Sequence, residues 1–446
     1  MNGHGEAVPA MAEIHPFHGL RFDPTVTGNM GQVICPPYDV IDAGMQVALH
    51  DRSPYNIVRL EYSLAHPSDG PSHNKYTRAG ETLNEWTENG VLKRDPRHGF
   101  YLHQHDFTYL GKSCMRLGLF AAVRLEEWEK GVVRRHEGTA AVFKMDRLNL
   151  LRATRTNISP VLAMYQDDRG KIASVLEKTK SGSPLWHTST EGESHTLWSI
   201  TRDDQVAVIR DVMSKQSIYI ADGHHRYETG LNYRDERRAA FPTAGSNAAF
   251  NFIMMSLIEL SDPCVIVLPT HRMVRGLSAS VLSGLKEKLK EYFELNAVQG
   301  GSLSGDAFSG ILDSRERGRM ALGMVGPEKD TPFILIPRER QSLRELMPAG
   351  RSEAYSRLDV SVLHHVVLEH LLGLEEGQNI SYTRSELEAC QRVASGEYQV
   401  AFLLGPVDTH AIKAVADAGD KMPQKSTYFY PKAPTGIVLN QLDGEI

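Results

Sequence analysis

The feature that most constrains the fold is an apolar segment that runs directly into a polar turn containing glycine. Residues 217–221 read Ser-Ile-Tyr-Ile-Ala and precede Asp222, Gly223, His224, His225 and Arg226. The apolar segment is typical of a buried strand, and residues 225–238 are expected to form the helix after it. A strand, a tight turn and a helix in this order direct backbone N–H groups and the positive end of the helix dipole towards one point. The turn is therefore expected to bind an anion, with the histidines and the arginine as further donors to phosphate oxygens.

Other interpretations of this turn stay open. A single histidine after a strand is commonly a core residue with its hydrogen bonds satisfied. His224 and His225 could share a metal only in an irregular turn, because adjacent residues on a regular element point in different directions. Asp222, at the end of the strand, could hold Mg²⁺ or orient a histidine. Phosphate binding is the preferred interpretation.

A second polar group lies upstream, between residues 135 and 147. His136 and Glu137 could form a general base with its orienting partner, because taking a proton from a hydroxyl requires an imidazole or carboxylate within hydrogen-bond reach. Lys144 is a candidate phosphate ligand and Asp146 a candidate metal ligand. A solvated loop that leads into a helix explains these residues equally well. Weaker candidates for the same site are Arg272, Lys425, Ser426 and Thr427.

Hydrophobic periodicity predicts the local elements. Residues 75–89 and 278–294 have the spacing of amphipathic helices, and residues 99–109 and 115–124 that of a β-hairpin. A second hairpin is expected from residues 252–260 and 265–268, and a Ser/Thr/Gly-rich loop from residues 178–196. These elements predict an α+β fold with a loose tail over 1–10, an N-terminal region over 11–130, a core over 131–275 and a C-terminal region over 276–446.

Composition excludes several classes of protein. The formal net charge of −6 provides no basic surface for nucleic acid. The four cysteines are scattered without a Cys-x-x-Cys pair, so a reducing compartment is expected. No apolar run approaches the ~20 residues that span a bilayer, and the first residues do not resemble a secretory signal. The expected location is the cytoplasm, without membrane partners, and a homo-oligomeric state stays open.

Six ordered segments together resemble one family, domain of unknown function 1015. They are residues 35–41 (CPPYDVI), 136–139 (HEGT), 146–147 (DR), 220–227 (IADGHHRY), 268–272 (LPTHR) and 422–432 (MPQKSTYFYPK). The resemblance extends from about residue 12 to the C-terminus. The turn at 222–226 is similar, in addition, to the Gly-x-x-Arg box of the ParB and sulfiredoxin superfamily, in which the box follows a strand and binds nucleotide phosphates.

The second resemblance implies a function. Free-serine kinases of that superfamily carry a similar turn and use a glutamate as base. It implies a ParB/sulfiredoxin-like central domain in which Gly223, His224, His225 and Arg226 hold the phosphates of ATP or ADP and Glu137 is the base. With Mg²⁺, such a protein would phosphorylate a small hydroxyl metabolite such as free serine. The alternatives are a metal-dependent phosphoesterase or nuclease, and a nucleotide-binding regulator without catalysis.

Overall fold

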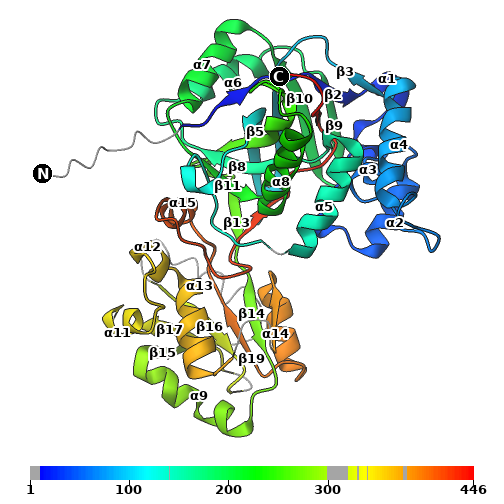
Figure 1. Cartoon of the computed structure of the whole chain (residues 1–446). Coiled ribbons are helices and arrows are strands. Elements are labelled where there is room, and N and C mark those ends of the chain that lie inside the picture. Colours follow the sequence, from blue (N-terminus) through cyan, green and yellow to red (C-terminus); the bar gives the residue numbers. More distant parts are fainter. Residues whose placement is uncertain (1–10, 140, 299–319, 329–330, 339, 375–378) are drawn as a thin grey trace, which may run out of the picture. The chain divides into compact units, whose positions relative to one another are not determined.

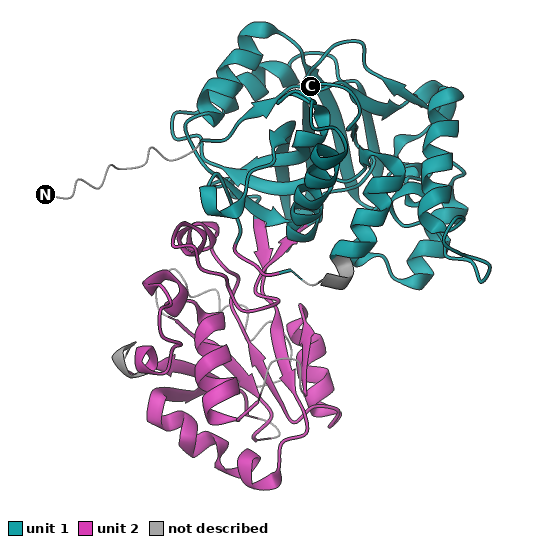
Figure 2. Ribbon diagram, in the orientation of Figure 1, with its two compact units in different colours: residues 1–135, 139–265, 431–446 teal, residues 136–138, 266–430 magenta. Residues whose placement is uncertain are grey.

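The computed structural model describes residues 11–446 except 140, 299–319, 329–330, 339 and 375–378. The tail expected over 1–10 lies outside the described residues. The chain divides into two compact units (Figure 2). Unit 1 contains residues 1–135, 139–265 and 431–446, and unit 2 contains residues 136–138 and 266–430. No helix among the described residues has both the length and the apolar character needed to cross a membrane.

The described residues of unit 1 form a nine-stranded, mostly antiparallel sheet (Figure 1). In spatial order its strands are β6 (Val133–Arg134), β11 (Ile218–Asp222), β8 (Val161–Tyr165), β12 (Phe252–Glu259), β5 (Lys112–Arg124), β4 (Phe100–Tyr109), β10 (Glu193–Ile200) and β9 (Trp186–Thr190), with β1 (Ile14–His15) beside β5. A second sheet joins β3 (Leu92–Arg94), β2 (Gly19–Phe22), β21 (Leu439–Gln441) and β7 (Thr156–Asn157).

Helices cover both faces of the large sheet. One face packs against α6 (Lys171–Lys180), α7 (Asp203–Met213) and α8 (His224–Ala240), and the other against α2 (Ala43–Arg52), α3 (Val58–Glu61) and α4 (Lys75–Glu88). The remaining helices of unit 1 are α1 (Pro24–Thr27), η1 (Met30–Gln32), η2 (Tyr38–Val40), η3 (Trp128–Lys130), α5 (Ala141–Thr154) and η4 (Ala249–Asn251). Because each strand alternates its side chains between the two faces, the sheet separates two apolar cores.

Unit 2 is built on an antiparallel sheet of its own. In its described part the order is β15 (Phe293–Ala297), β17 (Phe333–Pro337), β16 (Leu322–Val325), β19 (Val400–Leu403), β14 (His271–Val274) and β18 (Ile380–Thr383), and β13 (Ile266–Leu268) pairs with β20 (Tyr428–Tyr430). The helices of this described part are α9 (Ala279–Tyr292), α11 (Arg340–Glu345), α12 (Glu353–Ser356), α13 (Asp359–Val362), the π-helix η6 (Leu363–Leu371), α14 (Glu386–Ala394) and α15 (Thr409–Asp417).

The expected mixed α/β class is confirmed, as are α4, the β4–β5 hairpin and the passage from β11 into α8. Two local predictions were wrong. Residues 178–196 contain β9 and the start of β10, where Trp186 and Thr188 alternate inward with exposed neighbours. The hairpin expected from 252–260 and 265–268 does not form, because β12 pairs with β5 and β8 while β13 pairs with the distant β20.

The compact units also differ from the regions expected at 11–130, 131–275 and 276–446. Strand β5, from the first of these regions, pairs with β12 of the second, so both contribute to one sheet. The last residues, 431–446, belong to unit 1, because β21 pairs with β2 and β7. Long-range strand pairing, which local periodicity does not encode, decides these boundaries.

The return of the chain to unit 1 predicts that its last strand stabilises that unit. Leu439 of β21 is fully buried in the core that contains Leu20, its partner in β2. Leu439→Ala is therefore expected to lower the free energy of unfolding by about 2–5 kcal/mol, measured by denaturant titration. Leu110→Ala is the control, because Leu110 is 77% exposed and its truncation should change stability little. Equal stabilities of the two variants would contradict this role of β21.

Candidate functional site

The predicted phosphate site forms a strand–turn–helix motif in unit 1. Strand β11 ends at Asp222, Gly223 occupies the N-cap position and α8 begins at His224. Gly223 has a φ of +94°, and a Cβ atom at this position would lie 2.9 Å from Nε of Arg226. The left-handed backbone favours glycine here, and a side chain at this position would also displace the guanidinium of Arg226. His224 is buried and His225 half-buried in the first turn of α8.

Asp222 is the centre of an ion-pair network. Nη2 of Arg226 donates to Oδ2 of Asp222 at 2.7 Å, and Nη1 of Arg226 donates to the carbonyl oxygen of Pro160. Lys432 donates to Oδ1 of Asp222, and its Nζ lies 3.3 Å from Oδ2 of Asp39. Burial raises the pKa of Asp222, but the charges of Lys432 and Arg226 outweigh it and lower the pKa to about 2. Asp222 is consequently ionised at neutral pH and is a poor general base.

A buried carboxyl group that was not predicted from the sequence lies beside this network. Glu61 is 2% exposed, and it lines a cavity of about 50 Å³ together with Arg147, Ser159 and Arg226. Oγ of Ser159 donates to Glu61 Oε1 at 2.9 Å, and Nη1 of Arg147 lies 3.5 Å from the same oxygen. Burial raises the pKa of Glu61, although both arginines oppose this shift. Glu61 follows the turn at 53–56, and no chemical motif in the sequence marks it.

Asp146, the other candidate metal ligand, lies beside the same arginine. Its Oδ1 accepts hydrogen bonds from Lys75 (2.8 Å) and Tyr76 (2.7 Å), and its Oδ2 accepts from Nε (2.9 Å) and Nη2 (2.5 Å) of Arg147. Burial raises the pKa of Asp146, but the charge of Arg147 and the bond from Lys75 lower it to about 2. Because these donors occupy both oxygens, and because those of Asp222 are likewise paired with cations, neither carboxylate suits Mg²⁺ as arranged here.

Lys144 pairs with Glu228 of α8. Nζ of Lys144 lies 2.9 Å from Oε2 of Glu228, which also accepts from Oγ1 of Thr139 at 2.5 Å, and Nη1 of Arg135 lies 2.7 Å from Oε1. Burial raises the pKa of Glu228, but the hydrogen bonds from Thr139 and Lys144 outweigh it and lower the pKa. These contacts join residues 135, 139 and 144 to the helix that begins at the turn.

The remaining predicted residues lie in unit 2. Nε2 of His136 lies 2.9 Å from Oγ1 of Thr427, which in turn donates to Oε1 of Glu137 at 2.9 Å. Nη2 of Arg272 lies 3.2 Å from the carbonyl oxygen of Gln424 and 3.3 Å from that of Lys425, and Ser426 donates to the carbonyl oxygen of Pro423. Unit 2 therefore joins His136, Glu137 and Thr427, and it gives Arg272 and Ser426 backbone partners.

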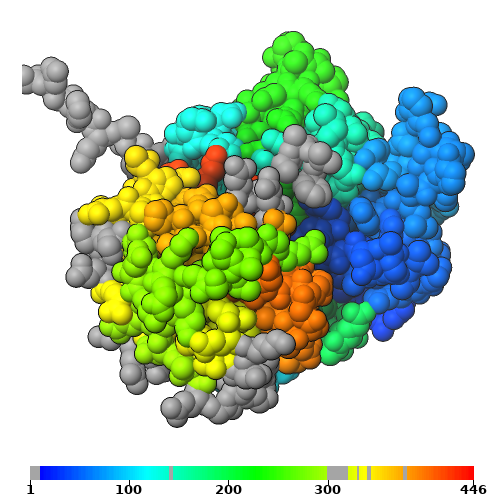
Figure 3. All heavy atoms as spheres, turned by 90° about the horizontal axis from the view of Figure 1, so that it is seen from below, coloured from blue at the N-terminus to red at the C-terminus, as the bar shows by residue number. Residues whose placement is uncertain are grey.

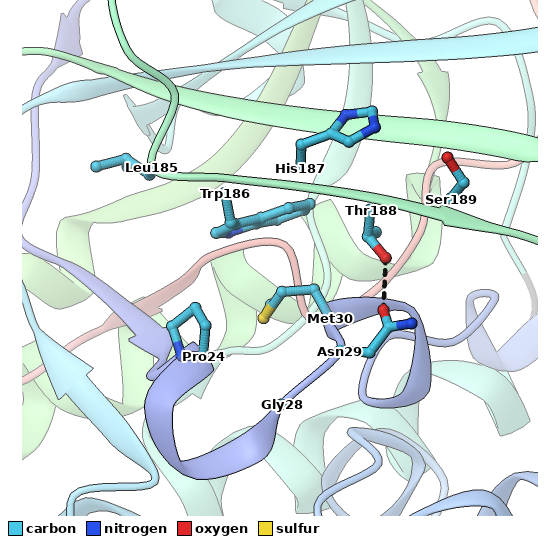
Figure 4. A pocket seen from close by; sticks show the side chains of 9 residues that line it. All are labelled: Pro24, Gly28, Asn29, Met30, Leu185, Trp186, His187, Thr188 and Ser189. Atoms are coloured by element: carbon cyan, nitrogen blue, oxygen red, sulfur yellow. Dashed lines mark hydrogen bonds between the residues drawn. The ribbon is translucent and has the colours of Figure 1, made fainter.

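The six sequence segments thus form two groups. In unit 1, Asp39, Arg147 and Lys432 contribute to the network around Asp222 and Glu61. In unit 2, residues 136–138, 268–272 and 422–430 make the second group. A separate pocket of unit 1, of about 500 Å³, is lined by Pro24 and by residues 28–30 and 185–189, and it contains none of the predicted residues (Figure 4). In it Thr188 donates to Asn29 at 2.7 Å.

Comparison with models of known protein families confirms the predicted family. A family model described as "Protein of unknown function (DUF1015)" matches residues 14–361. None of the curated proteins compared with the chain matches it. Similar solved structures include a free serine kinase in complex with AMP, at 14% identity and a TM-score of 0.31, covering 70% of this chain and 86% of that one. A conserved hypothetical protein from Pyrococcus furiosus matches at 13% identity and a TM-score of 0.32, with coverages of 71% and 93%. Truncated SbnI from Staphylococcus aureus matches at 11% identity and a TM-score of 0.33, with coverages of 73% and 87%.

The ion pairs of Asp222 predict a pH-dependent contribution to stability. Its folded pKa of about 2 is below the ordinary value of 3.8, so the stabilisation is present above pH ~4 and is lost as the pH falls towards 2. Asp222→Asn is expected to lower the free energy of unfolding by about 3 kcal/mol at pH 7, because two cations lose their buried partner. In denaturant titrations below pH ~4, the free energies of unfolding of the variant and the wild type should become more similar. Asp168→Asn, at an exposed position, is the control, and a difference independent of pH would contradict the assignment.

Proposed function

The chain belongs to the DUF1015 family, whose description names no activity, and we propose from its own residues that it is a nucleotide-dependent phosphotransferase. The donor is ATP or ADP, and the acceptor is the hydroxyl of a small metabolite such as free serine. The observation that carries the proposal is the passage from β11 through Gly223 into α8, with Arg226 and Lys432 held beside it.

The turn has the chemistry that phosphate binding requires. The first N–H groups of a helix have no intrahelical acceptor, and Gly223 supplies no side chain that could cap them. The helix dipole adds positive charge at the same end of α8. Asp222 holds Arg226 and Lys432 in fixed positions, so two cations lie beside the turn before any ligand binds. Fixed positive groups suit phosphoryl transfer, which depends mainly on positioning and charge stabilisation.

The contacts assign different tasks to the candidate residues. We propose that Gly223, His224, His225 and Arg226 hold the phosphates and that Asp222 positions the cations. Glu137 is proposed as the base, because its carboxylate is held by Thr427, which also contacts His136. If Glu137 is not the base, Glu61 is the next candidate, because it is a buried carboxyl group that lines a cavity with Arg226, and burial raises its pKa above the ordinary value.

The ion pairing of Asp222 and Asp146 also bears on the alternative functions. A metal-dependent phosphoesterase built on these two carboxylates would have to break their contacts with Arg226, Lys432, Lys75 and Arg147. This arrangement disfavours that reaction. A nucleotide-binding regulator remains the second candidate function, because the turn can bind phosphate without any base. Formation of a phosphorylated acceptor distinguishes the two.

Nucleotide binding is expected to stabilise the folded chain through the turn. A ligand at 100 times its Kd contributes about 2.7 kcal/mol, so ATP or ADP should raise the melting temperature. His225→Ala and Arg226→Lys should reduce the shift, because the first removes a donor and the second the planar guanidinium. Arg202→Ala, which loses only an exposed ion pair with Asp204, should keep it. Differential scanning fluorimetry measures these shifts with and without Mg²⁺, and an undiminished shift in both turn variants would exclude this phosphate site.

Catalysis is expected to depend on a residue that binding does not require. A base contributes about 10²–10⁴ in rate. Glu137→Gln should therefore lose most of the turnover, detected by mass spectrometry of a mixture of hydroxyl metabolites with ATP or ADP, and should keep the nucleotide-induced thermal shift. His225→Ala should lower both the turnover and the thermal shift. Turnover of Glu137→Gln within a few-fold of the wild type would remove Glu137 from the mechanism, and Glu61→Gln would then be tested in the same assay.

A further inference from the structure

A group of two histidines and one glutamate in unit 2 has no part in the proposed phosphotransfer. His364, His365 and Glu369 lie on the π-helix η6, and one ligand atom from each lies within 4.8 Å of the others. Nε2 of His364 is 3.2 Å from Oε1 of Glu369, and Nδ1 of His365 is 2.6 Å from Oε2. The two oxygens of one carboxylate thus face two imidazole rings.

The π-helix explains how adjacent histidines reach the same carboxylate. In an α-helix, residues four apart lie on one face, whereas residues five apart diverge around the axis. In η6 the backbone bonds span five residues, as in the bond from the Leu372 N–H to the Val367 carbonyl at 3.0 Å. Glu369 is five residues from His364 and four from His365. The wider turn therefore brings the Glu369 carboxylate within reach of both imidazole rings. Such π-segments are rare and occur frequently at functional sites.

Burial and hydrogen bonding suit the group to a metal ion. The His365 side chain is 8% exposed, and the hydroxyl of Tyr355 lies 2.8 Å from its Nε2, which fixes the ring in the manner of an outer-shell partner. Glu369 is 44% exposed, so the carboxylate side of the group is open to solvent. Helix α9 packs beside η6, and Figure 3 shows the two in lime green and amber on one face.

We propose that His364, His365 and Glu369 bind a divalent transition metal of the zinc class. Two imidazoles and one carboxylate are a ligand set that Zn²⁺ accepts, with ligand distances of about 2.0–2.2 Å and a fourth position left to water or another ligand. The ion would lie between Nδ1 of His365 and the Glu369 carboxylate, and Nε2 of His365 would then carry the ring proton and donate to the Tyr355 hydroxyl. The site lies in unit 2 and does not depend on the proposed phosphotransferase activity.

A second group of the same composition is a weaker candidate for electrostatic reasons. His105, Glu193 and His195 also have ligand atoms within 4.8 Å, but Nη2 of Arg116 lies 3.4 Å from Nδ1 of His105. A buried guanidinium repels a dication, and it also donates towards the nitrogen that would carry the proton of a metal-bound His105. Among the described groups, the one on η6 is therefore preferred.

The test uses the full chain, stripped with EDTA and dialysed. Zn²⁺ titration by calorimetry and metal analysis should give one tight equivalent per chain. His364→Ala and Glu369→Gln should each weaken binding by about tenfold or more. His370→Ala, on the same helix but outside the group, is the matched control and should bind like the wild type. Co²⁺ should show absorption bands of low-symmetry nitrogen and oxygen coordination, and these bands should be absent in the variants.

Two outcomes would overturn the proposal. The first is an affinity within twofold of the wild type in the His364→Ala/Glu369→Gln double variant. The second is loss of binding in His105→Gln but not in the η6 variants, which would assign the metal to the group beside Arg116. Circular dichroism and unfolding in EDTA verify that each variant is folded, so that loss of Zn²⁺ binding reports on the ligands alone.

Discussion

The ion pairs of Asp222 with Arg226 and Lys432 connect the parts of unit 1 on which the candidate site depends. Asp222 ends β11, Arg226 belongs to the first turn of α8 and Lys432 comes from the last segment of the chain. Through Lys432 the network reaches Asp39 in the N-terminal loop, and through the cavity beside Arg226 it reaches Glu61 and Arg147. Each charged group in this network has a partner of opposite charge, and the attraction within each pair offsets the free-energy cost of removing the charges from water.

This pairing also determines what chemistry the turn can support. Carboxylates whose pKa is about 2, such as Asp222 and Asp146, stay ionised and hold cations in place. An incoming phosphate would meet Arg226 and Lys432 already oriented, and it would compete with Asp222 for their charge. Glu61 differs from these carboxylates because burial dominates its environment and raises its pKa.

The distribution of polar residues between the two units gives each a distinct local chemistry. Unit 1 combines the turn with fixed cations, whereas unit 2 combines His136, Glu137 and Thr427 with the separate histidine pair on η6. The chain passes between the units at residues 136–138, 266 and 431, so both groups contain segments from opposite ends of the sequence.

The sequence by itself determined the elements whose signals are local. These elements are β11 with the glycine turn after it, helix α4 and the hairpin of β4 and β5. Each depends on residues that are neighbours in the sequence, and each is present as expected. Only the tertiary structure decided that Lys432 pairs with Asp222, that Glu61 lies behind Arg226 and that β13 pairs with β20. It also decided the helix type that brings His364 and His365 to Glu369. Hydrophobic periodicity reports the environment of a segment but not its partner, and these contacts depend on which distant segments pack together.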